Sequence, residues 1–459
     1  MREFWNRHTR ESPYWNPYTE TMPREQLRQM QFKRVNLLLE YAYARSPLYR
    51  RVYRNAGMEP GDITSWDDFV ERVPLLDKKD LLEAQAEHPP FGACQAAPLE
   101  HYFYLFQTSG STGMPMMTPF SFYAAAQNGD QWAHALWGIG MRQTDSAYFA
   151  FNWGTFSGFW AAYWGCRRLG ATVYSGGGLD TRQRIRQILE LRPTVLLSTP
   201  TYALYMAEVA RDLGVDLAGS SIRLSFHAGE PGVNIPATRE AIESAWGCTA
   251  HECYGVAEAG SLAAGCPTPG MIHIVEDFST SVVLDENGRQ VGDGEVGENI
   301  TTCFNNYLHP IIKYRTHDLV RPRYDRCACG RTSLRFEGGV LGRTDHMIII
   351  KGTNVYPSAI EALMGKVPGL TEHFEIHVDR EQRNDTVLVK VEAAPRQQAG
   401  AYAKLRDSFA RLLHESIKVR IGVEVLPPQS LPRYELKAKR LFDHRPKEHR
   451  WQVDQQRTA

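Results

Sequence analysis

The feature that most constrains the fold is an alternation of strand-like and helix-like segments between residues 145 and 255. Apolar runs such as "SAYFAFN" and "PTVLLSTP" are typical of buried strands, whereas "TRQRIRQILELR" and "TYALYMAEVARDLG" carry apolar residues at helical spacing. Strands that alternate with helices form a mostly parallel sheet covered on both faces. Ligands bind such sheets beyond the carboxyl ends of the strands. The loops expected at that edge are "FNWGTF", "STPTY", "HAGEPG" and "CYGVAEAG".

The remaining segments indicate two domains, which the length of 459 residues also favours. Residues 20–90 are predicted to be largely helical and residues 280–345 to form short β-strands. A smaller α/β region begins after "GRTDHMIIIKGTNVYP". We therefore predict an α/β chain in two parts. Residues 1–344 would form a large N-terminal domain with parallel sheets flanked by helices plus a β subdomain, and residues 345–459 a small mobile α/β C-terminal domain.

Charge and hydropathy exclude several classes of function. Lys+Arg and Asp+Glu both number 52, so the formal net charge is zero, which argues against nucleic acid or an anionic membrane as the main partner. No apolar stretch is long enough for a transmembrane helix, and the N-terminal "MREFWNRHTRESPYW" lacks the apolar core of a signal peptide. We therefore expect a cytoplasmic protein whose eight cysteines are mostly reduced.

The stretch "TSGSTG" (residues 108–113) raises the question of a phosphate site. Its glycines let the backbone approach a ligand closely, and successive N–H groups can form a nest for an anion. Phosphate loops usually also carry a lysine, but Met114 occupies the position where we would expect one, and the Walker A pattern is absent. Taken alone, the stretch is compatible with a phosphate loop or with a plain polar turn.

Five further motifs follow this stretch in order: "HAGEP", "ECYGVAE", "KYRTHDL", "GRTDHMIIIKGTNVYPSAIE" and "LPRYELKAKRLFD". Together the six resemble the adenylate-forming enzyme superfamily, and specifically its phenylacetate–coenzyme A ligase branch. The N-terminal "YWNPYTETMPREQLRQMQ" and "SPLYRRVY" also resemble the opening of that branch. The resemblance runs from about Tyr14 to Arg445, and six motifs in order are far more specific than any one of them.

This resemblance implies a reaction in two halves. A carboxylate attacks the α-phosphate of ATP to give an acyl-adenylate and pyrophosphate, and the thiol of coenzyme A then displaces AMP. Glu258 matches the family's Mg²⁺ ligand, which suits the oxygen ligands that Mg²⁺ prefers. Tyr254 would lie against adenine, Asp318 would bind the ribose hydroxyls and Arg343 would contact ribose or phosphate. The resemblance assigns ATP or AMP binding to Thr108, Ser109, Gly110, Ser111, Thr112, Gly113, Gly229, Glu230, Pro231, Tyr254, Gly255, Asp318 and Arg343.

The C-terminal motifs imply a moving domain. By resemblance Lys437 is the catalytic lysine that stabilises the charge developing at the α-phosphate, with Lys439 as the nearby rival. Asp345 matches the hinge, and Lys351 and Gly352 match the loop that lines the thiol channel. This sequence departs from the family in two places. Met114 replaces the loop lysine, which should weaken binding of ATP or pyrophosphate, and Leu436 replaces the usual glycine before Lys437.

Four residues form a candidate metal site: Cys266, His273, Cys327 and Cys329. Three thiolates and one imidazole suit a closed, structural Zn²⁺ site. Cys-x-Cys is a weaker signal than Cys-x-x-Cys, so four unrelated reduced residues are the alternative. Relatives in the resembling branch carry zinc at corresponding positions, which favours the metal.

The substrate is expected to be an aromatic acid, because aromatic side chains near the end of one predicted strand suit an aryl ring. The acid pocket is predicted to include Tyr148, Phe151, Asn152, Trp153 and Gly154, although ordinary strand packing would explain the same residues. The rival acceptors are a carrier-protein phosphopantetheine and an amine, and a non-catalytic nucleotide-binding homologue is a further alternative. A homodimer is compatible with the resemblance. The sequence leaves open which acid is used.

Overall fold

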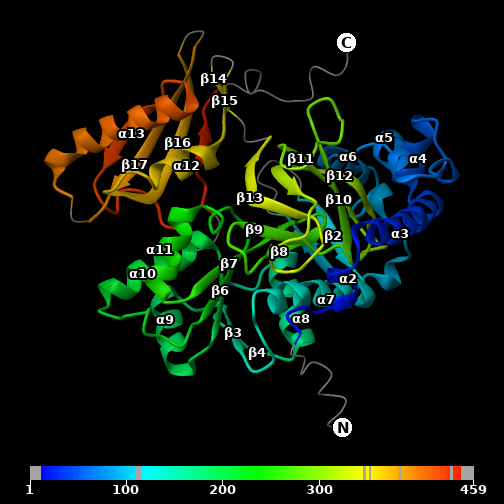
Figure 1. Cartoon of the computed structure of the whole chain (residues 1–459), viewed down its shortest axis with the longest axis horizontal. Helices are drawn as coiled ribbons and strands as arrows, with labels where there is room; N and C mark the ends of the chain where they lie inside the picture. Colours follow the sequence, from blue (N-terminus) through cyan, green and yellow to red (C-terminus); the bar gives the residue numbers. More distant parts are fainter. Residues whose placement is uncertain are drawn as a thin grey trace.

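The computed structural model describes residues 12–108, 115–344, 348–350, 353–381, 384–395, 397–434 and 438–445. It has a large α/β body and, beside it, a smaller α/β unit formed by the C-terminal part of the chain (Figure 1). Each part has its own hydrophobic core. The predicted combination of a large N-terminal domain with a small C-terminal one is therefore confirmed, while the predicted boundary at Asp345 lies outside the described residues.

In the described chain eleven strands form one central sheet, in the order β10-β11-β12-β13-β9-β8-β7-β6-β5-β3-β4. Its parallel half contains the strands that the alternation predicted, and each pairs with its neighbour in parallel register. These strands are β3 (Ser146–Phe149), β4 (Thr172–Ser175), β5 (Val195–Ser198), β6 (Leu224–His227) and β7 (Thr249–Val256).

Helices cover both faces of the parallel half. One face carries α9 (Thr181–Leu191), α10 (Pro200–Asp212) and α11 (Pro236–Trp246), which pack with Tyr148. The other face carries α7 (Phe122–Gly138) and α8 (Ser157–Leu169), which pack with Phe149. The strand–helix alternation did not predict α7 and α8. Both are apolar around most of their circumference, so helical periodicity is weak in their sequences.

The second half of the sheet is antiparallel and joins the first at the β7–β8 hairpin. Short β-strands were predicted only for residues 280–345, so the strands between residues 260 and 274 were missed. The sequence also did not predict that these antiparallel strands would extend the parallel sheet. The strands are β8 (Gly260–Gly265), β9 (Met271–Ile274), β10 (Ser279–Leu284), β11 (Gly297–Cys303), β12 (Ile311–Arg323) and β13 (Arg335–Arg343). Because β7 belongs to both halves, the loops after the parallel strands face residues from β12 and β13.

The N-terminal region packs on the antiparallel half and shares its core. Its helices are α2 (Pro17–Glu20), α3 (Arg24–Arg45), α4 (Pro47–Asn55), α5 (Trp66–Arg72) and α6 (Lys78–Glu87), with short 3₁₀ turns at Pro60–Asp62, Gly92–Cys94 and Leu99–His101. A separate hairpin of β1 (Tyr104–Gln107) and β2 (Met117–Phe120) brackets the predicted phosphate loop. Asp77 caps α6 through a capping box with Asp80, which fixes where this helix begins.

The C-terminal domain is built on a four-stranded sheet in the order β18-β17-β16-β19. Its elements are β14 (Ile348–Ile350), β15 (Thr353–Val355), α12 (Pro357–Met364), β16 (Leu370–Glu381), β17 (Asn384–Ala393), a 3₁₀ turn at Ala399–Ala401, α13 (Tyr402–Ile417), β18 (Gly422–Leu426) and β19 (Leu441–Asp443). In the part of the chain that the structure describes, no helix is both long and apolar enough to cross a membrane.

Candidate active site

A cavity lies at the carboxyl edge of the parallel strands, where the fold rule places ligands. The space between its walls measures about 1110 Å³, including solvent at its mouth. Backbone at the ends of β5, β6 and β7 forms one side, and α7 and α8 form the other. The wall is rich in aromatic side chains, namely Phe106, Trp132, Phe151, Phe156, Phe159 and Phe226.

The predicted acid-pocket residues divide between the two faces of the sheet. Phe151 lines the cavity. Tyr148 is fully buried on the opposite face, where its hydroxyl donates to Gln187 (2.7 Å). Successive side chains of a strand point to opposite faces, so Tyr148 and Phe151 cannot share one wall. The prediction that Tyr148 lines the same pocket as Phe151 is therefore corrected.

The other three predicted pocket residues follow β3 in a loop outside the residues that line the cavity. The Asn152 side chain accepts hydrogen bonds from Arg184 (3.0 Å) and from the backbone N–H of Gly178 (2.9 Å). The Trp153 ring stacks on Phe149 with 5.4 Å between centroids, and Gly154 accepts a hydrogen bond from the Trp160 indole. These contacts brace the loop beside the cavity.

Three residues predicted to bind the nucleotide converge in one network. The Tyr254 hydroxyl donates to Asp318 Oδ2 (2.8 Å), and Arg343 Nη1 lies 2.7 Å from Asp318 Oδ1. Asp318 and Arg343 are cross-strand partners in β12 and β13, and Tyr254 comes from β7. Burial, with the Asp318 carboxylate nearby, raises the pKa of Tyr254 well above its usual range, so its hydroxyl stays protonated as a donor.

The predicted phosphate loop is clamped at both ends. The Thr108 N–H donates to the Met116 carbonyl (3.0 Å), and the Met116 N–H donates to Thr108 Oγ1 (3.0 Å). Beyond the loop, Gln85 of α6 donates to the Pro115 carbonyl (2.9 Å) and accepts from the Met117 N–H (2.8 Å). The loop residues themselves lie outside the described part of the chain: Ser109, Gly110, Ser111, Thr112, Gly113 and Met114.

Helix α6 brings a cation to the site that the sequence did not predict. Lys78 Nζ lies 2.9 Å from Glu258 Oε1, and the Glu258 side chain is only 6% exposed. The neighbouring Asp77 carboxylate contacts His317 Nε2 (3.0 Å), one residue before Asp318. The only available signal was the helix-start pattern at Asp77, which locates the beginning of α6 but not its neighbour in space.

Two glycines shape the backbone around the cavity. Gly229, in the "HAGEP" turn, has φ +99°, a conformation that favours glycine. A Cβ at Gly255 would lie 2.5 Å from the Gly260 carbonyl oxygen, so the β7–β8 hairpin requires glycine there. Both line the cavity. Pro231 is exposed beside them.

Glu230 contacts the C-terminal domain. Its Oε1 accepts from the Thr201 N–H (3.0 Å), and its Oε2 accepts from the Ala438 N–H (3.0 Å). Ala438 directly follows Lys437, so the predicted lysine motif lies next to the cavity. Besides the phosphate-loop residues, four further predicted residues fall outside the described part of the chain: Asp345, Lys351, Gly352 and Lys437.

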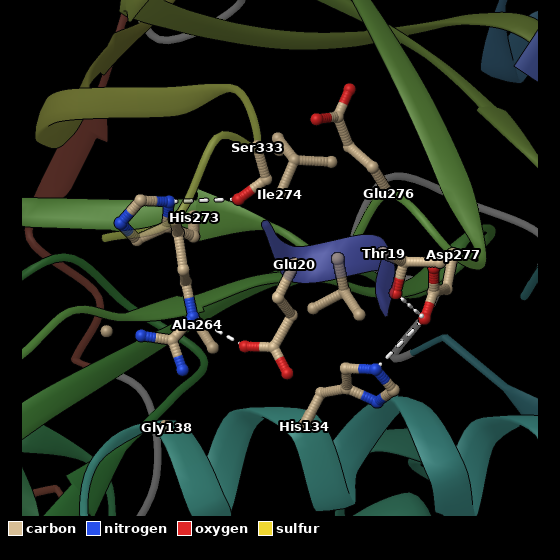
Figure 2. A pocket seen from close by; sticks show the side chains of 13 residues that line it. Thr19, Glu20, His134, Gly138, Ala264, His273, Ile274, Glu276, Asp277 and Ser333 are labelled. Carbon is tan, nitrogen blue, oxygen red and sulfur yellow. Dashed lines mark hydrogen bonds and ion pairs between the residues drawn. The ribbon is translucent and has the colours of Figure 1, made fainter. Parts of the chain in front are cut away.

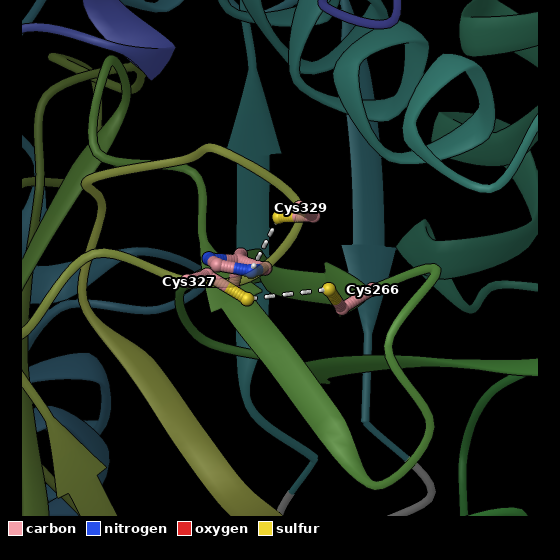
Figure 3. Close-up of side chains that lie close together, drawn as sticks. Cys266, Cys327 and Cys329 are labelled. Atoms are coloured by element: carbon pink, nitrogen blue, oxygen red, sulfur yellow. Dashed lines mark hydrogen bonds between the residues drawn. The ribbon is translucent and has the colours of Figure 1, made fainter.

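The candidate metal ligands come together although 61 residues separate Cys266 from Cys327. Cys266 Sγ is 3.7 Å from Cys327 Sγ, and Cys329 Sγ is 3.4 Å from His273 Nε2 (Figure 3). The four ligand atoms lie within 4.8 Å of one another. Ser333 Oγ is 3.0 Å from His273 Nδ1, which leaves Nε2 facing the sulfurs. These donors fit the Cys₃His set of a structural zinc site.

A buried polar cluster adjoins this site and ties it to the N-terminal segment. Asp277 contacts Thr19 Oγ1 (2.8 Å) and His134 Nε2 (3.0 Å), and Arg331 pairs with Glu20 (2.6 Å) (Figure 2). Burial alone would lower the pKa of His134, but the Asp277 contact outweighs it and the pKa is raised. The polar groups of this small cavity therefore pair with one another, as in a structural ion network.

The AMP-binding enzyme family matches residues 56–301, and the AMP-binding enzyme C-terminal domain matches residues 352–445. The chain is 32% identical over 451 residues to the phenylacetate-coenzyme A ligase of Thermus thermophilus, covering 94% of this chain and 99% of that protein. This chain belongs to the AMP-binding enzyme family. The resemblance that the motifs predicted is confirmed.

Other relatives extend this result. The phenylacetate-coenzyme A ligase of Escherichia coli is 32% identical over 440 residues, covering 93% of this AMP-binding enzyme and 97% of that protein. A crystal structure of 2-hydroxyisobutyryl-CoA ligase in the postadenylation state with 2-HIB-AMP has a TM-score of 0.90 at 31% identity, covering 95% of this chain and 93% of that one. By this kinship the enzyme is an AMP-forming acid–thiol ligase that uses ATP and coenzyme A.

The relative position of the two domains matches one of two states of 2-hydroxyisobutyryl-CoA ligase better than the other. Its structure in the thioesterification state, with 2-HIB-AMP and CoA, has a TM-score of only 0.72 at the same 31% identity, covering 94% of this chain and 92% of that one. The C-terminal domain of this AMP-binding enzyme is therefore placed as in the postadenylation state.

Proposed function

We propose that this enzyme activates an aromatic carboxylic acid with ATP to an acyl-adenylate and transfers the acyl group to the thiol of coenzyme A. The observation that carries the proposal is the aromatic-walled cavity at the carboxyl edge of β5–β7, beside the Tyr254–Asp318–Arg343 network. Aromatic walls favour an aryl ring over a small aliphatic acid, because rings gain from edge and stacking contacts beyond buried area.

The nucleotide would bind on the Gly229 and Gly255 side of the cavity. Asp318 accepts from Tyr254 and pairs with Arg343, and by the family resemblance its carboxylate would bind the ribose hydroxyls. In this arrangement Tyr254 orients the Asp318 carboxylate, and its ring is the expected neighbour of adenine. Thr108 and residues 109–113 would cradle the phosphates. Glu258 would supply an oxygen ligand to Mg²⁺, the cation that bridges phosphate oxygens in such reactions.

We propose that Lys78 supplies the phosphate-binding charge that Met114 lacks. Its ammonium lies on Glu258, and its helix clamps the end of the loop through Gln85. Lys78→Met is expected to raise the KM for ATP about 10–100-fold, because a hydrogen bond to a charged group is worth about 1.5–3 kcal/mol. Initial-rate kinetics of pyrophosphate–ATP exchange measure this constant.

Two matched variants sharpen that prediction. Lys79→Met removes an exposed lysine of the same helix and is expected to leave the KM for ATP unchanged. Met114→Lys in the Lys78→Met background is expected to recover part of the loss, since it restores a cation at the loop. Equal constants for Lys78→Met and the unmodified enzyme would refute the role of Lys78.

The aromatic pocket is tested by filling it. Ala161 lines the cavity from α8, so Ala161→Phe places a ring in the space proposed for the substrate ring. We expect kcat/KM for phenylacetate to fall about 10–200-fold, the range for a pocket misfit of about 1–3 kcal/mol. Activity with propionate should change much less. A parallel fall for both acids would place the substrate ring elsewhere.

The overall proposal is tested by carboxylate-dependent pyrophosphate–ATP exchange over a panel of aromatic and aliphatic acids. Detection of the acyl thioester with coenzyme A, against a pantetheinylated carrier protein and an amine, then identifies the acceptor. Absence of exchange with every aromatic acid would contradict the proposal that the substrate is aromatic. Absence of exchange with any acid would favour a non-catalytic nucleotide-binding homologue.

Several further features belong to the same proposal. Asp345 would be the hinge between residues 1–344 and 345–459, and Lys351 and Gly352 would line the thiol channel after rotation. Zn²⁺ would bind Cys266, His273, Cys327 and Cys329 as a structural ion. It would hold together the loops that contact the N-terminal segment. A homodimer and a cytoplasmic location stay predictions.

A further inference from the structure

One carboxylate of the large domain is held by two side chains of the small domain. Glu208 lies on α10, and its Oε1 is 2.9 Å from His373 Nε2 in β16. Its Oε2 accepts from Arg433 Nε (3.1 Å). His373 is buried, with 6% of its side chain exposed, and the Arg433 side chain is 16% exposed. Burial alone would raise the pKa of Glu208, but His373 and Arg433 outweigh it and lower the pKa, so the carboxylate is charged.

Arg433 connects this contact to the lysine motif. Its two terminal nitrogens bind the Glu392 carboxylate of β17 (2.9 and 2.8 Å), which is almost fully buried. Glu392 also accepts from the backbone N–H groups of Gln429 and Leu431. The segment that enters the lysine motif is therefore held rigidly on the small domain, with Arg433 pointing from it to the large domain.

A second carboxylate holds the other end of the motif. Glu230 accepts from the Ala438 N–H (3.0 Å), and Arg440 Nη2 reaches Thr201 Oγ1 (3.4 Å) at the start of α10. Lys437 lies between Arg433 and Ala438, so the two large-domain carboxylates hold the chain on both sides of it.

These contacts belong to one orientation of the domains. The partners lie on rigid elements of different domains, and the chain matches the postadenylation state of its relative far better than the thioesterification state, with TM-scores of 0.90 and 0.72. A rotation that withdraws the lysine motif from the cavity must separate Ala438 from Glu230. It must also separate His373 and Arg433 from Glu208.

We propose that Glu208 and Glu230 are positioning residues that latch the small domain in the orientation that presents Lys437 for adenylate formation, and that the latch opens before thioester formation. This inference rests on the proposed function. The latch consists of Glu208, Glu230, His373, Arg433 and the Ala438 N–H. Its energetic effect falls on the first half-reaction, because the second half-reaction takes place with these contacts broken.

The test uses Glu208→Gln in the full-length enzyme and measures the two halves separately. Pyrophosphate–ATP exchange with phenylacetate is expected to slow about tenfold, since a charge-paired hydrogen bond is lost. Thioester formation from synthetic phenylacetyl-adenylate and coenzyme A is expected to stay unchanged or to rise. His373→Gln should shift the same ratio, whereas Asp212→Asn, an exposed change on the same helix, should shift neither half.

A second measurement reports the latch directly. Hydrogen–deuterium exchange with ATP bound should become faster at residues 438–443 in Glu208→Gln, with the melting temperature unchanged. Equal slowing of both half-reactions, or no change in either half and none in exchange protection, would overturn the latch. If the unmodified enzyme activates no aromatic acid, the proposed function fails, yet the exchange comparison with ATP still decides the latch.

Discussion

Replacing Lys437 by alanine is expected to slow adenylate formation about 10²–10³-fold, while thioester formation from a pre-made acyl-adenylate falls much less. Attack on the α-phosphate develops negative charge that a positioned cation stabilises. The neighbouring Ala438 donates its N–H to Glu230 (3.0 Å) beside the cavity, which supports the proposed role of the lysine motif in the first half-reaction. Single-turnover assays of each half, with synthetic phenylacetyl-adenylate supplied for the second, measure the split.

Two further variants control this result. Lys439→Ala removes a lysine whose ammonium lies over the Phe442 ring at 4.7 Å, within the small domain, and is expected to spare both halves. Gly352→Trp should do the reverse of Lys437→Ala, sparing adenylate formation and blocking the thiol. A selective loss of adenylation in Lys439→Ala, with Lys437→Ala unaffected, would move the catalytic role by two residues.

Replacing Cys327 by serine is expected to release about one Zn²⁺ per chain and to lower the melting temperature clearly. A structural zinc contributes its binding free energy to folding, about 10–16 kcal/mol in zinc-finger peptides, and a ligand lost from a closed site forfeits part of this. Here the metal-binding loops also contact the segment around residues 14–20, because the Tyr14 hydroxyl donates to the Cys329 carbonyl (3.1 Å) and Arg331 pairs with Glu20. Elemental analysis and thermal unfolding check both effects.

The matched control for this change is Cys248→Ser. Cys248 is a half-buried thiol whose neighbour is Ser225, outside the metal cluster, so the same atom is exchanged without touching a ligand. It should keep the zinc and unfold near the temperature of the unmodified enzyme. Purified protein that holds no zinc, yet unfolds at the same temperature after Cys327→Ser, would show that the four residues are only packed thiols and an imidazole.

Local pattern determined much of the fold. The strands and helices between residues 145 and 255 follow from apolar periodicity, and helices α9 and α10 begin at the N-caps Asp180 and Thr199. Because parallel strands carry ligands at one edge, the same pattern predicted the edge of the sheet at which the cavity lies. Six short motifs in order identified the family, since each is a local stretch of backbone and side chains that can be read directly from the sequence.

Only the tertiary structure decided which of these residues meet. Periodicity did not show that β7 joins the parallel and antiparallel halves, a pairing that depends on contacts distant in sequence. Nor did it show that Tyr148 faces away from the wall that holds Phe151, because the register of one strand is set by both layers of helices packed on it.

The two least predictable contacts are Lys78 with Glu258, across 180 residues of chain, and Glu208 with His373, across 165. Each partner taken singly has the sequence signature of a solvated surface charge. Burial and pairing of these charges suggested the proposed roles. Both features depend on how separate elements and domains pack, which no local stretch of sequence specifies.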